Sequence, residues 1–190
     1  MEPATIAQRV GQLHSSKTSE AMARMPQKTR DPRGSKPRDP SDERIFHRTL
    51  ERGFYVHMEM VDRANRALVK TKLGLPHHRA LYFVVRQPGI SLNELRSILR
   101  ISHQALSRTI QELRRLNLIE QKPGQEDRRR QCNHPTPKGL TLLRKLTKLQ
   151  YQHVDQCLAG VSERELDVFW DVLLRMMRDR DRTWITTFGS

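Results

Sequence analysis

The chain has 190 residues, which is enough for one domain with a buried core and an additional tail. Its 35 Lys and Arg against 21 Asp and Glu give a formal net charge of +14, which favours a polyanionic partner over a solvated cationic surface without one. Two cysteines, Cys132 and Cys157, are too few for a disulfide scaffold and fit a reducing cytosol, and no apolar run approaches the length of a membrane span.

Residues 1–40 show little helical periodicity and carry several prolines among scattered Lys and Arg. They predict a disordered basic N-terminal arm. Such an arm would reach along a DNA backbone if the partner is DNA, but we favour a passive tail. Two alternatives stay open: an Arg-rich organelle-targeting peptide, against which the acidic residues of the arm count, and a translation start at Met22 or Met25.

A long amphipathic helix is predicted over residues 41–72. Its apolar side chains keep to one face for roughly six turns, longer than a small domain needs, so we expect this helix to pack against a partner. The residues of this stripe are Phe46, Leu50, Phe54, Met58, Val61 and Leu68. The sequence Leu73-Gly74-Leu75-Pro76 ends the helix, and a compact helix follows over residues 76–86 until Gln87-Pro88-Gly89 stops it.

Residues 91–117 predict two short helices joined by a tight turn. Ser91 with Glu94 three residues later is a capping box, and an apolar row follows at Leu92, Leu95, Ile98 and Leu99. The row stops at Arg100-Ile101, and Ser102 begins a second helix whose inward residues are Leu106, Ile110 and Leu113. The other faces of this second helix carry hydrogen-bonding side chains, namely His103, Gln104, Ser107, Arg108, Gln111 and Arg114. This arrangement is typical of a helix-turn-helix.

A β-hairpin is predicted directly after these helices. Asn117 can take the left-handed conformation that ends a helix, and residues 118–122 and 131–134 read as the two strands. The turn Pro123-Gly124-Gln125-Glu126-Asp127 leads into Arg128-Arg129-Arg130, so one arm of the hairpin carries three arginines. Thr136 followed by Pro137 then predicts the start of another helix.

The last third of the chain predicts two helices. The first ends at Gly160, and the second begins at a capping box formed by Ser162 and Glu165. Their apolar stripes consist of Leu142 or Leu143, Leu146, Leu149, Val154 and Cys157 or Leu158 in the first helix, and of Leu166, Phe169, Trp170, Leu173 and Met177 in the second. We interpret both stripes as ordinary core rather than as a cofactor site.

The helix-turn-helix and the hairpin, with Asp127-Arg128-Arg129 in the wing and Thr136-Pro137-Lys138-Gly139 opening the next helix, resemble the MarR family of bacterial winged-helix transcriptional regulators over about residues 43–184. The resemblance implies a mainly α fold with a small β-hairpin wing, in which a winged helix-turn-helix is joined to a helical dimerisation region. The expected division is the arm at 1–40, the dimerisation region at 41–75 and 137–187, and a winged helix-turn-helix DNA-binding domain at 76–136. Ile90 would form a short strand that pairs with the hairpin.

The resemblance also implies a function. It describes a cytoplasmic, nucleoid-associated homodimer that binds double-stranded DNA at a near-palindromic operator and represses transcription until a small-molecule effector releases it. Two-fold symmetry would place the recognition helices roughly 34 Å apart, in successive major grooves. We expect no enzyme activity, no cofactor and no membrane partner, since the sequence has no phosphate-binding glycine loop, HExxH or nucleophile elbow. The alternative is a non-specific architectural DNA- or RNA-binding protein with the same basic surface.

Candidate DNA contacts fall in two places. The N-terminal half of the helix over residues 102–117 is expected in the major groove, where the side chains within reach are Ser102, His103, Gln104, Ser107 and Arg108. In the wing, the family pattern Asp-x-Arg falls on Asp127 and Arg129, which implies that Arg129 enters the minor groove while Asp127 steadies the hairpin. Phosphates are expected to bind Lys122, Arg128 and Arg130. Solvated surface is the alternative for each of these side chains.

In the family, effectors commonly bind between the dimerisation helices and the DNA-reading region. The candidate side chains there suit a small aromatic carboxylate, and they are Tyr55, His57, His78, Arg79 and Tyr82. A core or surface role is the alternative for each. Neither cysteine lies near the first helix, so thiol sensing is not expected, and Cys132-Asn133-His134 lacks a second pair of ligands for a metal site.

Overall fold

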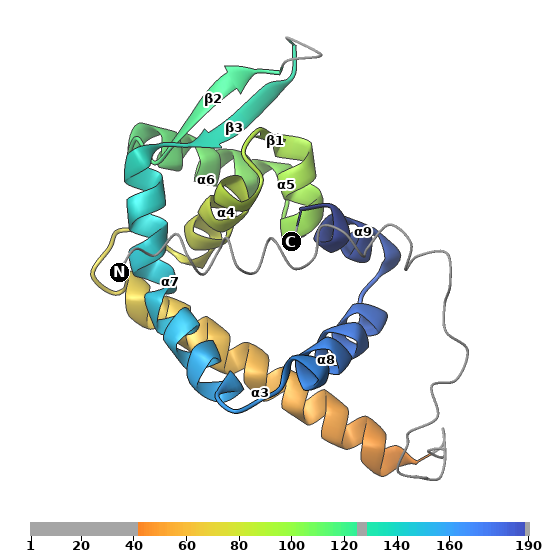
Figure 1. Ribbon diagram of the computed structural model, residues 1–190. Coiled ribbons are helices and arrows are strands. Elements are labelled where there is room, and N and C mark those ends of the chain that lie inside the picture. The colour runs from red at the N-terminus through yellow and green to blue at the C-terminus, as the bar shows by residue number, and fades with distance from the viewer. Residues whose placement is uncertain (1–41, 125–128, 189–190) are drawn as a thin grey trace.

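The computed structural model describes residues 42–124 and 129–188, and it is mainly helical with one small antiparallel sheet (Figure 1). The predicted fold class is therefore confirmed. The predictions for the arm at 1–40, for Asp127 and for Arg128 lie outside the described residues. In chain order the elements are α3 (Glu43–Leu68), α4 (Leu75–Arg86), β1 (Ile90–Ser91), α5 (Leu92–Leu99), α6 (His103–Arg115), β2 (Ile119–Pro123), β3 (Gln131–Pro135), α7 (Pro137–Leu158), α8 (Glu163–Met176) and α9 (Asp179–Phe188).

The sheet has the strand order β1-β3-β2, with both pairings antiparallel. The short strand expected at Ile90 is present, and Ile90 lies opposite Asn133 of the hairpin. Asn133 is fully buried, donates from Nδ2 to the carbonyl of Ile90 at 2.8 Å and accepts from Nε2 of Gln121 at 3.1 Å. Because a buried amide must be hydrogen-bonded, these contacts fix the hairpin against β1 and so against the start of α5.

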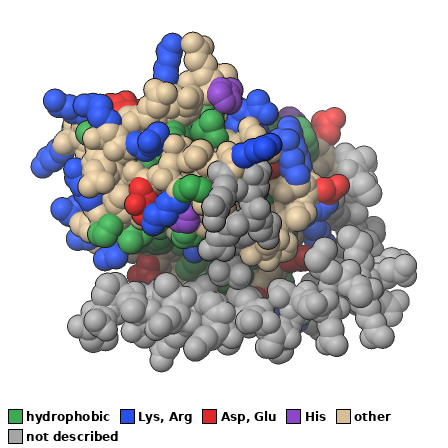
Figure 2. Space-filling model, turned by 90° about the horizontal axis from the view of Figure 1, so that it is seen from above, with side chains coloured by type: hydrophobic (Ala, Val, Ile, Leu, Met, Phe, Trp, Pro, Cys, Tyr) green, Lys and Arg blue, Asp and Glu red, His purple; other side chains and the backbone are tan. Residues whose placement is uncertain are grey.

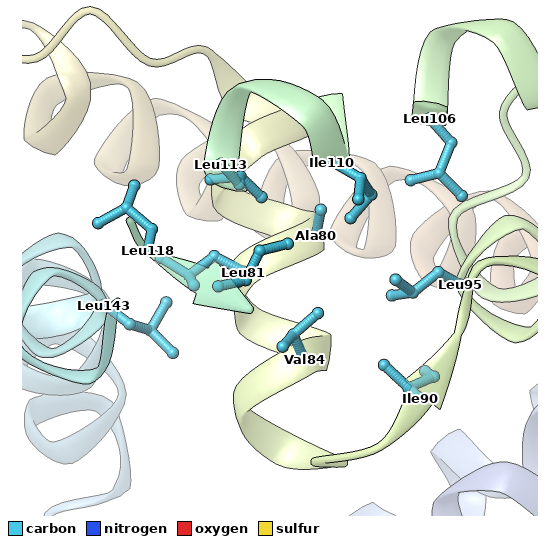
Figure 3. Packing of buried hydrophobic residues seen from close by; sticks show 11 residues of the cluster. Ala80, Leu81, Val84, Ile90, Leu95, Leu106, Ile110, Leu113, Leu118 and Leu143 are labelled. Atoms are coloured by element: carbon cyan, nitrogen blue, oxygen red, sulfur yellow. The ribbon is translucent and has the colours of Figure 1, made fainter. Parts of the chain in front are cut away.

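The core of the winged region forms around α4. Ala80, Leu81 and Val84 of this helix are completely buried. Figure 3 shows that they face side chains from the neighbouring elements, namely Ile90, Leu95, Leu106, Ile110, Leu113, Leu118 and Leu143. Fully burying a leucine or isoleucine side chain stabilises the folded state by about 1.5–3 kcal/mol, so this shared core fixes α6 and the hairpin relative to α4.

The helix starts follow the predicted capping chemistry. The hydroxyl groups of Ser91, Ser102, Thr136 and Ser162 each accept a backbone N–H from the first turn of their helix. Asn117 takes the predicted left-handed conformation, with φ 55°, and Arg100 has the same conformation, with φ 54°, at the turn between α5 and α6. Since left-handed backbone is unfavourable for residues with a Cβ, the turn at Arg100 depends on its surroundings.

The apolar stripes of the outer helices are largely exposed in the single chain. Helix α3 packs against α7, where Nε2 of Gln150 donates to the carbonyl of Met60 at 3.1 Å, and α8 lies below the winged region (Figure 1). No residue of α8 is buried. The interpretation of the α7 and α8 stripes as ordinary core holds for Leu143 and Leu146, which are buried, but Leu149, Val154, Phe169, Trp170 and Leu173 are exposed in the single chain. The α3 stripe, which was expected to pack against a partner, is exposed at Phe46, Leu50 and Phe54.

The last segment forms three helices where two were predicted. Met177 is extended, with φ −86° and ψ 159°, and separates α8 from α9. The overlooked signal is acidic, since Asp179 and Asp181 lie in the first turn of α9, where negative charge is favourable. Helix α9 falls within the region predicted for dimerisation, but it returns to the winged region beside α5 (Figure 1). Within the described part of the chain, no helix is long and apolar enough to cross a membrane.

Candidate nucleic-acid interface

Helix α6 carries one apolar face and one polar face. Its buried residues are Leu106, Thr109, Ile110 and Leu113, and the three apolar side chains belong to the core around α4. The helix starts at Ser102, whose hydroxyl accepts the N–H of Ala105 at 3.2 Å. The side chains predicted for DNA binding are therefore on the outer side: Ser102, His103, Gln104 and Arg108 are exposed and Ser107 is half-buried. This polar face stands free of the rest of the described chain, with its orientation set by the core.

A partly buried hydrogen bond between His77 and Glu112 fixes the C-terminal half of α6. Nδ1 of His77 accepts the N–H of Gly74 at 3.2 Å, so the ring proton lies on Nε2, which donates to the carboxylate of Glu112 at 3.0 Å. The end of the helix is held by Lys138, whose ammonium donates to the carbonyl of Leu116 at 2.9 Å. The first contact connects α6 to the start of α4, and the second connects it to the start of α7.

The turn of the wing is closed by the N–H of Gly124, which donates to the carbonyl of Arg130 at 2.8 Å. Arg129 is exposed next to this point. Lys122 is also exposed, but its ammonium is 2.7 Å from the carboxylate of Glu120 on the same strand. Arg129 and Lys122 thus lie at the outer part of the hairpin. The ion pair between Lys122 and Glu120 joins two exposed side chains, so it contributes little to stability and leaves Lys122 able to bind another anion.

Arg130, which was predicted to bind phosphate, forms an ion pair within the protein. Its guanidinium donates to the carboxylate of Glu94 at 2.5 Å, and the same carboxylate oxygen accepts the N–H of Ser91 at 2.8 Å. Burial raises the pKa of Glu94, but hydrogen bonds from Arg130 and Ser91 outweigh this effect and hold the pKa of the carboxyl below its ordinary value. Arg130 therefore connects the wing to the first turn of α5.

The surface around these residues is strongly basic. Figure 2, viewed from the wing side of the molecule, shows Lys and Arg side chains over much of the described surface, with fewer Asp and Glu side chains among them. On α6 the exposed arginines are Arg108, Arg114 and Arg115. A positive surface around a polar helix face suits a phosphate backbone flanking base edges.

A separate cavity of about 410 Å³ lies between α3, α4 and α7. Of the residues predicted for effector binding, it is lined by His57, His78, Arg79 and Tyr82. Tyr55 is not among the lining residues, and its 69% exposed side chain lies on another face of α3 because two residues rotate a helix by more than half a turn. Its prediction as an effector contact is therefore not supported by the geometry.

Two titratable groups of the cavity, His78 and Tyr82, have shifted pKa values. His78 is only 6% exposed, and its Nε2 has no hydrogen-bond partner among the described residues. Burial, with a smaller effect of the nearby Arg79 charge, lowers the pKa of His78, so the ring is neutral at physiological pH. Burial raises the pKa of Tyr82. The sequence missed Gln150 and Tyr151, which α7 contributes to the same cavity.

The remaining candidates are the cysteines. Cys132 is buried in β3, and Cys157 is exposed on α7 with its sulfur 3.7 Å from Nε2 of His153. In the described part of the chain, no three His, Cys, Asp or Glu side chains gather where they could hold a metal ion.

Known proteins resemble this chain in sequence and in fold. A family model described as MarR family matches residues 71–130. The HTH-type transcriptional regulator PetP of Rhodobacter capsulatus is 29% identical over 137 residues, which cover 72% of this chain and 82% of that protein.

Solved structures have the same fold. A MarR family regulator from Listeria monocytogenes, solved in complex with a 26mer DNA, has a TM-score of 0.59 at 21% identity and covers 73% of this chain and 93% of its own. A MarR family protein from Bacillus stearothermophilus has a TM-score of 0.59 at 15% identity, covering 71% of this chain and 94% of its own. The family model identifies the winged region, residues 71–130, as a winged helix-turn-helix of the MarR family of transcriptional regulators, and the chain is similar to PetP over 72% of its length.

Proposed function

We propose that this regulator is a homodimeric repressor that binds a near-palindromic operator and is released by a small aromatic carboxylate. The observation that carries the proposal is the geometry of α6. Its apolar face is fixed in the core by Leu106, Ile110 and Leu113, while its polar face is exposed beside a basic hairpin. A helix presented in this way fits the major groove, which is wide enough to admit it. The relative from Listeria monocytogenes, which was solved with DNA, supports the same use of the fold.

Each DNA-facing side chain has a proposed role that follows from its chemistry. Gln104 suits adenine and Arg108 suits guanine, because each can form two hydrogen bonds with that base. His103, Ser107 and the exposed hydroxyl end of α6 at Ser102 are placed for flanking contacts. In the wing, Arg129 is proposed for the minor groove, with Lys122 and Arg128 on phosphates. Arg130 reaches a phosphate only by sharing or leaving its ion pair with Glu94.

The exposed apolar faces support the proposal of a homodimer. Phe54 on α3 is 57% exposed and Phe169 on α8 is 51% exposed, and each belongs to a continuous apolar stripe. Large exposed apolar surfaces of this kind mark protein interfaces in soluble proteins. A second copy of the chain related by two-fold symmetry would cover both stripes and place the two α6 helices about one DNA turn apart.

The cavity supports the proposal of an effector. Tyr82, Phe83 and Tyr151 provide aromatic walls, and Arg79 on the same lining supplies a guanidinium for a carboxylate. The buried Nε2 of His78 gives a further hydrogen-bonding atom without a partner in the described protein. The cavity lies between α3 and α7 on one side and α4 on the other. A bound ligand would therefore change the orientation of the winged region relative to α3 and α7.

The effector proposal is tested with benzoate as the probe. Benzoate should raise the melting temperature of the wild-type protein and weaken its binding to the operator duplex, whereas Arg79→Gln should lose both responses. Tyr55→Phe serves as the control, because Tyr55 is an exposed neighbour outside the cavity. Equal responses of wild type and Arg79→Gln would remove Arg79 from the site, and no response of the wild type to millimolar benzoate would reject this class of ligand.

The DNA-binding proposal is tested by fluorescence anisotropy. The duplex upstream of the gene for this protein is titrated at physiological salt, with a scrambled duplex as the control. A preference of about 10³ or more for the upstream duplex is expected of an operator reader. Equal, strongly salt-dependent binding to both duplexes would instead favour a non-specific architectural protein, for which the net charge of +14 is sufficient.

A further inference from the structure

Helix α9 contacts the winged region through two of its side chains, Trp184 and Asp181. The ring of Trp184 meets the ring of Phe83 at 5.0 Å between centroids and 75° between planes. Its indole Nε1–H donates to Oε1 of Gln87 at 2.9 Å. Both partners belong to the last turn of α4 and its cap, so Trp184 fixes α9 to the end of the central helix of the core.

A second contact lies at the helix-turn-helix itself. Asp181 of α9 forms an ion pair with Arg100, the left-handed residue between α5 and α6. Arg100 stands two positions before Ser102, the residue that caps α6. The carboxylate of Asp181 therefore pairs with the turn between α5 and α6, and this turn determines the direction in which α6 begins.

The two contacts place α9 on the side of the winged region away from its junction with α7 (Figure 1). Figure 1 shows α7 leaving the winged region on one side and α9 touching it on the other, with α8 leading into α9. With its junctions to α3 and α7 alone, the winged region could pivot about these two junctions. An attachment through α9 removes this freedom, and two recognition helices that must meet successive major grooves require a fixed orientation.

We propose that α9 is a strap that holds the helix-turn-helix in its DNA-reading orientation, so that Asp181 and Trp184 are positioning residues for operator binding. This inference rests on the proposed function as an operator reader. Phe83 lines the cavity between α3, α4 and α7 and also contacts Trp184, so the strap meets the wall of the proposed effector site.

The test exchanges the two charges of the Arg100–Asp181 ion pair in the full-length protein. Arg100→Asp suits the left-handed turn, since aspartate tolerates that conformation better than most residues. Arg100→Asp and Asp181→Arg should each lower the preference for the upstream duplex over the scrambled duplex by about threefold to tenfold, and the double variant should recover to within about twofold of wild type. Asp179→Arg is the matched control, because Asp179 pairs with Arg182 inside α9.

The outcomes separate positioning from direct contact. If Arg100 binds a phosphate itself, Arg100→Asp weakens binding, Asp181→Arg does not rescue it, and the salt slope falls by about one; this would overturn the strap. An Asp181→Arg variant with wild-type preference would do the same. Trp184→Phe, which keeps the ring contact but loses the indole N–H, should show a smaller loss of preference than Trp184→Ala.

Hydrogen exchange of the free protein gives a readout that needs no operator. Asp181→Arg and Trp184→Ala should speed amide exchange over the α5–α6 turn, and Asp179→Arg should not. Unchanged exchange in both strap variants would overturn the inference even if the protein reads an operator. Faster exchange in a protein that shows no preference among duplexes would retain the strap and reject the proposed function.

Discussion

At the scale of single residues, the junction between the wing and α7 depends on Gly139. A Cβ added at this position would lie 2.0 Å from the carbonyl oxygen of Leu118, and that oxygen accepts the N–H of Thr136. The hydroxyl of Thr136 in turn donates to the carbonyl of Asn117 at 2.7 Å and accepts the N–H of Gly139 at 3.1 Å. The glycine is needed because two backbone segments approach each other here, and its own φ is not the reason.

Gly139→Ala should lower the free energy of unfolding by about 2–3 kcal/mol, since the backbone of Leu118 or α7 must shift to admit the methyl group. Urea denaturation followed by circular dichroism measures the loss. Gly74→Ala is the control, because a Cβ there meets atoms at 3.6 Å or more, and it should cost less than about 1 kcal/mol. A Gly139→Ala protein as stable as the control would show that this contact can relax freely.

The ion pair between Glu94 and Arg130 should make stability depend on pH. The folded-state pKa of Glu94 is lowered from the ordinary value of 4.5, so its contribution is present above that value and is lost as the pH falls through the lower folded-state pKa. Glu94→Gln should therefore reduce stability at neutral pH and have little effect in strong acid. Glu165→Gln is the matched control, because Glu165 forms the same capping box on α8 without an arginine in its described hydrogen bonds. Equal pH profiles for the two variants would argue against a role for Arg130.

At the scale of elements, α6 and the wing should contribute differently to DNA binding. Arg108→Ala should cost about 1–3 kcal/mol on the operator and relax the preference at one base pair, because Arg108 lies on the helix face proposed for base contacts. Arg129→Ala should cost a similar amount while leaving the dimer intact. Anisotropy titrations with single-base variants of the operator measure both. An unchanged affinity of Arg129→Ala at physiological salt would remove this residue from the interface.

The local elements could be read from the sequence because their signals are local. Capping residues such as Ser91 and Thr136, the left-handed Asn117 and the apolar periodicity of α6 act over a few positions, and the structure confirms them. The pairing of Arg130 with Glu94 and of Asp181 with Arg100 joins residues far apart in the chain, which no periodic pattern encodes. The docking of α9 was missed for this reason. Tyr55 was named as an effector candidate from the family resemblance, which does not show which face of α3 carries each side chain.

At the scale of the whole molecule, the apolar faces of α3 and α8 should hold two chains together. Phe54→Glu and Phe169→Glu should shift the protein to monomers, because each would place a charge in a desolvated interface. Size-exclusion chromatography with light scattering measures the mass directly. Val69→Glu is the control, since Val69 is equally apolar and 79% exposed but lies beyond the end of α3. Dimers of unchanged stability in both phenylalanine variants would exclude these faces from the interface.

The most direct test of the whole account is selection of bound duplexes from a random pool by the full-length protein at physiological salt. A homodimer that reads DNA with two α6 helices should enrich a near-palindrome whose half-sites are centred about 10 base pairs apart. The Arg108→Ala variant should lose information at one symmetric pair of positions within the same motif. A pool without any enriched motif would contradict sequence-specific reading and leave the basic surface as a non-specific binder of nucleic acid.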